Sequence, residues 1–216
     1  MNTLATVLLS ALPIAVGWAV HVWWLRGCLN TARRDPLTGL VTRDGFTRRA
    51  GVLVKDPRAV VVLADVDKFK HINDTYGHAA GDALLKATAD RLARHVGRTG
   101  VAGRLGGDEF AAVLLDHHGT AADLLGVLHG VLARPVDGEG SAVRTTVSLG
   151  WVRGADFPGD DLSGLLRRAD EAMYVAKQAR TGTRRAGLGR LLATVTGRRA
   201  SRTGARTDAP VVGVTV

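Results

Sequence analysis

The sequence predicts one domain of the α/β or α+β class, in which helices cover a sheet. The run AVVVLADV at 59–66 is continuously apolar and β-branched, which is typical of a buried strand. Two further strand-like runs meet at Gly106-Gly107, a dipeptide that indicates a hairpin turn. Helical periodicities separate the strands, so the order after the first helix is β-α-β-β-α-β-α. This alternation favours a single sheet with helices packed against it.

The first predicted helix follows the sequence DPLTGL at 35–40, whose proline and glycine interrupt regular structure. Thr42 is expected to cap a helix that continues to about Lys55. Phe46 and Ala50 lie at helical spacing within it, so this helix has one apolar face.

The middle of the chain contains the predicted hairpin. After the strand at 59–66 we expect a short helix and turn at 68–74, and then a longer helix at 79–96 with leucines along one face. The hairpin strands are expected at 101–105 and 109–115.

The last three elements complete the domain. Residues 120–133 are expected to be helical, and 143–152 alternate like a strand. Residues 161–179 predict a long amphipathic helix. The chain shows no internal repeat.

Composition and charge exclude several classes of protein. An apolar content of 46% excludes a wholly disordered chain, and the single cysteine, Cys28, excludes a disulfide framework and a cysteine-rich zinc site. The net charge of +9 arises from 29 basic and 20 acidic residues, but nine of the basic residues and no acidic one lie between Lys177 and Arg206. The rest of the chain is therefore neutral. No aromatic residue is interleaved with the basic ones, so we expect no nucleic-acid partner.

Residues 1–25 carry no charged side chain and predict a transmembrane anchor. A helix of about 20 apolar residues crosses a bilayer, and tryptophans gather at the C-terminal end of this stretch. Arginines follow, which places the bulk of the chain in the cytoplasm. A cleaved signal peptide would have a basic N-terminal region, which this stretch lacks, and a buried core helix is the other alternative. We expect a single-pass protein of the cell membrane.

Carboxylates stand at two strand ends. Asp65 and Asp67 end the apolar strand, and Asp108 and Glu109 follow the glycines of the hairpin. A carboxylate at the end of a buried strand is costly unless water, a cation or hydrogen bonds satisfy it. If the first strand pairs with the hairpin, Asp65 and Asp108 converge, and together they attract a hard cation such as Mg²⁺. Taken singly, each motif has the alternative of a strand-end cap or an ordinary tight turn.

Four motifs, in the right order, resemble the GGDEF family, the diguanylate cyclases. RLGGDEF at 104–110 resembles the family signature, and DVDKFKHINDTYGHAAGDALL at 65–85 resembles its second hallmark. DPLTGL at 35–40 and ADEAMYVAK at 169–177 resemble its first motif and its last helix. Such a combination is far more specific than one short match. The resemblance implies a palm-like, five-stranded sheet flanked by helices, as in nucleotidyl cyclases, and the condensation of two GTP into cyclic di-GMP with release of pyrophosphate.

The resemblance assigns a metal and catalytic centre. Asp65, the backbone carbonyl of Val66, Asp108 and Glu109 would bind Mg²⁺ or Mn²⁺. Asp108 would also deprotonate the 3′-hydroxyl that attacks the α-phosphate, and Glu109 would contribute to the same centre. Lys70 would stabilise charge on the transferring phosphate.

The resemblance also assigns six residues to GTP binding. An amide and a carboxylate among them suit the donor and acceptor edge of guanine, with a histidine beside them. Two glycines would let the backbone approach the phosphates closely, and a lysine would reach the terminal phosphates. These residues are Asn73, His78, Asp82, Gly106, Gly107 and Lys177.

The chain departs from the family pattern at two places. Where many members carry an inhibitory R-x-x-D site, this chain has Gly97 and Gly100, so we expect product feedback through that site to be absent. The last helix continues KQART at 177–181 in place of Lys-x-x-Gly-Arg, which leaves Arg180 and Arg184 as alternatives for a second phosphate contact.

The expected organisation is an anchor at 1–25, a linker at 26–34, a cyclase domain at 35–184 and a basic tail at 185–216. Because each GGDEF subunit binds one GTP, the resemblance implies a homodimer. The tail is expected to be disordered, either in contact with anionic lipid or without a partner. The alternative function is a silent GGDEF domain that acts as a GTP receptor or a scaffold at the membrane, and another cyclic nucleotide product also stays open.

Overall fold

The computed structural model describes residues 16–22, 34–137, 142–179 and 181–187. Most of the predicted anchor and nearly all of the basic tail lie outside these residues. Residues 16–22 are helical. Within the part of the chain that the structure describes, no helix is both long and apolar enough to span a bilayer.

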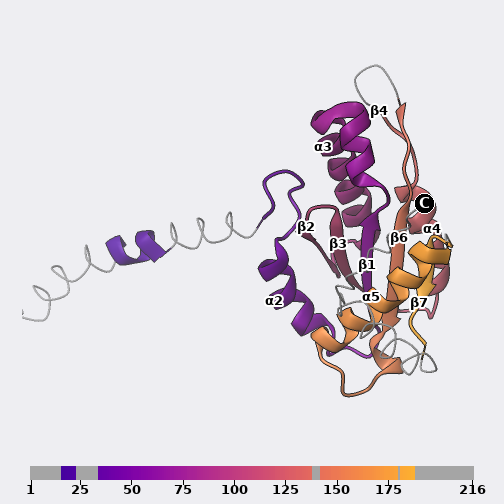
Figure 1. Ribbon diagram of the computed structural model, residues 1–216. Helices are drawn as coiled ribbons and strands as arrows, with labels where there is room; N and C mark the ends of the chain where they lie inside the picture. The colour runs from indigo at the N-terminus through magenta and orange to yellow at the C-terminus, as the bar shows by residue number, and fades with distance from the viewer. Residues whose placement is uncertain (1–15, 23–33, 138–141, 180, 188–216) are drawn as a thin grey trace, which may run out of the picture. The chain divides into compact units, whose positions relative to one another are not determined.

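A five-stranded sheet with helices on both faces forms the domain (Figure 1). In spatial order its strands are β2 (Val101–Gly106), β3 (Glu109–Leu115), β1 (Ala59–Val66), β6 (Val147–Arg153) and β7 (Thr183–Arg185). The helices that cover it are α2 (Arg43–Leu53), α3 (Phe69–Val96), α4 (Ala121–Leu132) and α5 (Leu162–Ala179). β7 runs parallel to β6, and the other neighbours are antiparallel. The structure thus confirms an α/β fold with a five-stranded mixed sheet.

β1 lies at the centre of the sheet and supplies both hydrophobic cores. Val60 and Val62 face a core that α3 and α4 cover, whereas Val61 and Leu63 face a second core under α2 and α5. Side chains alternate between the faces of a strand, so a run that is apolar at every position is what a doubly covered strand requires. Asp65 continues the second series and therefore points toward the α2 and α5 side.

The strand predicted at 143–152 is wrong in its first part. β6 begins only at Val147, and residues Ala142–Val143 form β5, which pairs with β4 (Val136–Asp137) in a separate two-stranded sheet. β7 was not among the strands read from the sequence pattern. Its three residues are too few to show a periodicity, and it forms only because β6 offers an edge to pair with.

The two helices predicted at 68–74 and 79–96 are present as the two halves of α3, which a non-helical kink at Gly77 separates. Gly77 has φ 81° and ψ 164°, a conformation that a residue without a Cβ adopts freely. The kink brings residues from the two halves of α3 together, which shapes the site described below.

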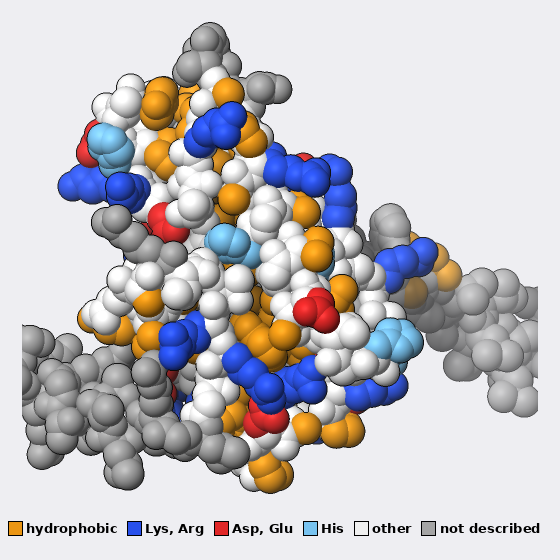
Figure 2. Space-filling view, turned by 90° about the vertical axis from the view of Figure 1, so that its right-hand side faces the viewer, with side chains coloured by type: hydrophobic (Ala, Val, Ile, Leu, Met, Phe, Trp, Pro, Cys, Tyr) orange, Lys and Arg blue, Asp and Glu red, His pale blue; other side chains and the backbone are white. Residues whose placement is uncertain are grey.

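The surface charge agrees with the neutral balance of the domain. On the face drawn in Figure 2, Lys and Arg side chains stand in separate groups with uncharged and hydrophobic surface between them. A duplex nucleic acid would need a continuous basic stripe along its phosphates. This face of the described domain does not offer one.

Candidate active site

The turn between β2 and β3 lies at the end of β1. The pairing of β1 with β3 sets Glu109 opposite Asp65, and the Val66 N–H donates to the carbonyl of Asp108 at 3.3 Å. Gly107, within the turn, has φ 50°, in the left-handed region that favours glycine. The pairing on which the sequence prediction depended is present, and it brings Asp65 and Asp108 to the same strand end.

The pKa of Asp65 is perturbed at this strand end. Burial raises its pKa above the ordinary value, and the charges of Asp108 and Asp67 raise it further against the opposing effect of Lys177. The ammonium of Lys177, which comes from α5, donates to Asp65 Oδ1 at 2.5 Å. Burial alone would lower the pKa of Lys177, but the carboxylates around it outweigh burial and raise it. A cation therefore already balances part of this negative charge.

These donors fit a hard divalent cation. Asp65 and Asp108 supply carboxylate oxygens that repel each other, and oxygen donors are what Mg²⁺ prefers. Among the described residues no group of three or more His, Cys, Asp or Glu side chains gathers as metal ligands. A metal here would therefore need main-chain oxygen, such as that of Val66, or substrate phosphate. Glu109 lies opposite Asp65 in the register of β1 and β3, and its carboxylate is 3.7 Å from the guanidinium of Arg43.

The conformation of the turn is held by contacts that the sequence analysis missed. Arg104 donates to the carbonyl of Gly107 at 2.7 and 3.0 Å and to Asp35 at 3.0 Å. Asp35 also accepts hydrogen bonds from the backbone and the hydroxyl of Thr38. The motif at 35–40 therefore supports the turn through Arg104. The available signal for this contact was that Asp35 and Thr38 belong to one recognised motif and Arg104 to another.

Asp35 is expected to stabilise the domain in a pH-dependent way. Burial by itself raises the pKa of Asp35, but the hydrogen bonds from Thr38 and Arg104 outweigh burial and lower it. A lowered pKa gives stability that is present above the unfolded-state value of about 3.9 and is lost as the pH falls through the folded-state value. Asp35→Asn should therefore cost about 2 kcal/mol at pH 7, and the difference should shrink below about pH 4. Urea unfolding of both proteins at pH 7 and pH 3 measures it, and an equal difference at both would contradict this account.

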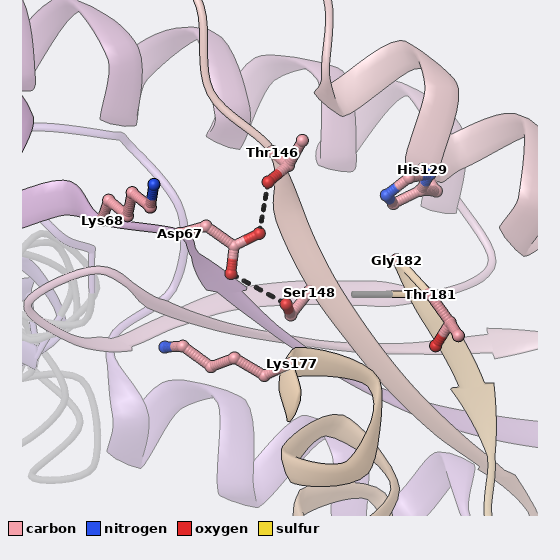
Figure 3. A pocket seen from close by; sticks show the side chains of 8 residues that line it. All are labelled: Asp67, Lys68, His129, Thr146, Ser148, Lys177, Thr181 and Gly182. Atoms are coloured by element: carbon pink, nitrogen blue, oxygen red, sulfur yellow. Dashed lines mark hydrogen bonds between the residues drawn. The ribbon is translucent and has the colours of Figure 1, made fainter. Parts of the chain in front are cut away.

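A pocket of about 540 Å³ adjoins the carboxylates (Figure 3). Asp67 points into it and accepts hydrogen bonds from the hydroxyls of Thr146 at 2.5 Å and Ser148 at 2.8 Å. These bonds join the end of β1 to β6. Lys68 and Lys177 bring two ammonium groups to the pocket, which suits an anionic ligand. Its lining residues are Asp67, Lys68, His129, Thr146, Ser148, Lys177, Thr181 and Gly182.

The three residues assigned to the base and ribose, Asn73, His78 and Asp82, lie on α3 together with Lys70, which is assigned to the transferring phosphate. Lys70, His78 and Asp82 are exposed, whereas Asn73 is partly buried. Asn73 precedes the kink at Gly77 and Asp82 follows it, so the bend turns both halves toward one region. None of the four belongs to the residues that line the pocket of Figure 3. The structure thus places the lysine-bearing pocket and the residues of α3 on separate parts of the candidate site.

Arg180 and Arg184 are the two candidates for the second phosphate contact. Arg180 lies outside the described residues. Arg184 lies in β7 opposite Gly150 and is not among the described residues that line the pocket. Thr181 and Gly182 line the pocket in their place.

Comparisons with known proteins agree on one family. The family model described as "Diguanylate cyclase, GGDEF domain" matches residues 32–183. An uncharacterised 19.3 kDa protein of Streptomyces ambofaciens is 48% identical over 177 residues, which are 81% of this chain and 94% of that protein. Diguanylate cyclase TpbB of Pseudomonas aeruginosa is 37% identical over 168 residues, which are 72% of this chain and 38% of TpbB.

A solved structure gives the same result for the fold. The GGDEF domain of TpbB from Pseudomonas aeruginosa superposes with a TM-score of 0.65 at 34% identity, covering 72% of this chain and 95% of that one. The likeness is therefore to the domain of TpbB. The chain spans well under half of that whole relative but nearly all of the Streptomyces protein.

Proposed function

Because the chain belongs to the GGDEF family of diguanylate cyclases, we propose that it condenses two molecules of GTP into cyclic di-GMP and releases pyrophosphate. The observation that carries the proposal is the signature turn docked on the end of β1, where Asp108 meets Asp65. The 3′-hydroxyl of each GTP attacks the α-phosphate of the other, so each attack forms one phosphodiester bond and expels one pyrophosphate.

The metal centre in this proposal consists of Asp65, Asp108 and the main-chain carbonyl of Val66, and Glu109 joins it if it leaves Arg43. A bound Mg²⁺ or Mn²⁺ lowers the pKa of the 3′-hydroxyl and offsets phosphate charge. Asp108 accepts the proton of the attacking hydroxyl. The repulsion between Asp65 and Asp108 supports this role, since it gives both a reason to accept a cation.

The polyphosphate lies in the pocket of Figure 3 in this proposal. Lys177 reaches both the pocket and Asp65, so it contacts phosphate beside the metal centre. Lys68 and the hydroxyl of Thr181 add positive charge and a hydrogen-bond donor. Gly106 and Gly107 leave the turn without side chains, which permits a close approach of the nucleotide. Lys70 stabilises the transferring phosphate.

The alternative of a silent receptor is less well supported. A receptor that only binds GTP has no need to keep Asp65 beside Asp108 at one strand end, where burial and the charge of Asp108 raise the pKa of Asp65. The turn also retains Gly106, Gly107 and Glu109 together with the Arg104 contacts that hold it. These features favour turnover over binding alone.

We propose further that catalysis requires a homodimer and that the protein is attached to the cell membrane. One subunit presents one 3′-hydroxyl, so ring closure needs a second. The uncharged stretch 1–25 would cross the membrane once with the domain in the cytoplasm, and the tail at 185–216 would contact anionic headgroups. Membrane fractionation of the whole chain, compared with residues 35–216, measures the attachment, and equal partition of the two would oppose it.

The central test is an assay of the purified chain with GTP and Mg²⁺. We expect cyclic di-GMP by mass spectrometry, with a specific activity that rises with protein concentration as dimers form. If no cyclic di-GMP forms with Mg²⁺ or Mn²⁺, the proposed activity is contradicted. If the specific activity stays constant down to protein concentrations far below those at which dimers form, the proposed need for a homodimer is contradicted.

Added cyclic di-GMP is expected not to inhibit through positions 97 and 100. A Cβ at Gly100 would lie 2.4 Å from the carbonyl of Val113, so this backbone has no room for an aspartate there.

A further inference from the structure

Asn73 and Gly81 lie in direct contact across the kink of α3. In a straight helix, residues eight positions apart are separated by about 12 Å along the axis. Here a Cβ added to Gly81 would lie 1.9 Å from Asn73 Oδ1 and 3.0 Å from its Cγ. The kink at Gly77 folds the first half of α3 back far enough to produce this contact. The amide of Asn73 therefore occupies the space that a side chain at position 81 would fill.

The amide of Asn73 has an unsatisfied acceptor. Its Oδ1 is buried and accepts no hydrogen bond within the described protein. Buried polar atoms are paired as a rule, and exceptions occur where a ligand or a rearrangement supplies the partner. No bond to this oxygen fixes the amide, so packing fixes it. The atoms that pack against it belong to Gly81, with the ring of Phe69 closing the same space at 3.2 Å from the added Cβ.

We propose that Gly81 is a positioning residue for recognition of the guanine base. The absence of a side chain at position 81 lets the Asn73 amide lie beside Asp82, the residue after Gly81. Both polar groups can then contact the same base. A methyl group at position 81 expels the amide and leaves Asp82 in place. The inference rests on the proposed function, because Asn73 and Asp82 are assigned to the base through that function.

A purely structural role for Gly81 predicts different behaviour. If Gly81 only allowed α3 to pack, its replacement would lower the stability of the domain and weaken the binding of all nucleotides equally. A positioning role acts through Asn73 and is confined to the base. The two roles are therefore separated by comparing a guanine with an adenine nucleotide, and by removing Asn73.

The experiment uses the full chain and two unreactive probes, 3′-deoxy-GTP and 3′-deoxy-ATP, which lack the attacking hydroxyl. Gly81→Ala is expected to weaken the binding of 3′-deoxy-GTP about tenfold, which corresponds to the loss of one hydrogen bond. The affinity for 3′-deoxy-ATP should stay unchanged. The KM for GTP should rise by the same factor with kcat nearly constant. Gly126→Ala is the matched control, since Gly126 is also helical and has nothing within 4 Å of an added Cβ.

A double-mutant cycle completes the test. Asn73→Ala should cause the same loss of 3′-deoxy-GTP affinity, and Gly81→Ala should cost nothing further in that background. The double variant should also melt at a higher temperature than Gly81→Ala alone, because the clash is gone, which keeps the test valid if the single variant folds poorly. Additive losses of 3′-deoxy-GTP affinity in the double variant, or an equal loss of 3′-deoxy-ATP affinity in Gly81→Ala, would overturn the inference. If the unmodified chain itself shows no preference for 3′-deoxy-GTP, the proposed function fails first and the inference fails with it.

Discussion

Asp108→Asn is expected to lower the rate of cyclic di-GMP formation about a thousandfold while the domain stays folded. Asp108 lies in the turn that docks on the end of β1, and its charge acts directly on Asp65. The substitution keeps the size of the side chain and removes the charge that accepts a proton and attracts a divalent cation. The loss of about 4 kcal/mol of transition-state stabilisation is what one electrostatic group of this kind supplies.

Asp65→Asn should have an effect of similar size for the same reason, and Asp90→Asn is the matched control. Asp90 is an exposed acid on α3, and the same chemical change there should leave the rate unaltered. Steady-state rates with GTP measure the effect, and binding of Mn²⁺ followed by its paramagnetic signal gives an independent readout. Retention of more than a tenth of the rate by Asp108→Asn would refute the proposed role.

The stability of these variants tests whether the carboxylates serve function or hold the fold together. Burial raises the pKa of Asp65, which means that the folded protein disfavours the charge that function requires. The ion pair with Lys177 offsets part of this, but the lysine is 47% exposed and such pairs contribute little. We therefore expect Asp65→Asn to melt within a few degrees of the unmodified protein. Loss of activity without loss of stability distinguishes a functional carboxylate from a structural one such as Asp116, which accepts backbone hydrogen bonds from His118 and from the start of α4 at Thr120 and Ala121.

The elements around β1 could be predicted because their causes are local. An unbroken apolar run requires cover on both faces, and Gly106-Gly107 with strands on either side requires a hairpin. The meeting of Asp65 and Asp108 then followed from pairing those strands. For these elements the local sequence pattern was enough to predict the fold.

Other parts of the site depend on contacts between distant segments and leave no periodic trace. Glu109 pairs with Arg43 on α2, and Asp67 accepts hydrogen bonds from the hydroxyls of Thr146 and of Ser148 on β6. The break between the two helices of α3 could be predicted from Gly77, but the angle between them could not. The contact of Asn73 with Gly81 follows only from the angle of that kink.

Gly150→Ala is expected to destabilise the domain by more than about 4 kcal/mol, a large part of the stability of a typical domain. Gly150 lies in β6, beside the central strand, and α5 crosses it so closely that an added Cβ would lie 2.0 Å from the carbonyl oxygen of Ala169 and 2.2 Å from the amide nitrogen of Met173. Both are backbone atoms of a buried helix, so they cannot move aside as a side-chain end would. The methyl group must push α5 away from the sheet.

The same displacement should reach the candidate site. Lys177 follows Met173 by one turn of α5, and its bond to Asp65 depends on how closely that helix lies against β6 and β1. Urea unfolding measures the stability of Gly150→Ala, and Gly130→Ala in α4, where an added Cβ meets nothing within 4 Å, should instead be neutral or slightly stabilising. If enough Gly150→Ala folds for assay, its KM for GTP should rise, because a shifted α5 withdraws Lys177 from the pocket. An unfolding midpoint equal to that of Gly130→Ala would show that α5 does not pack on β6 as described.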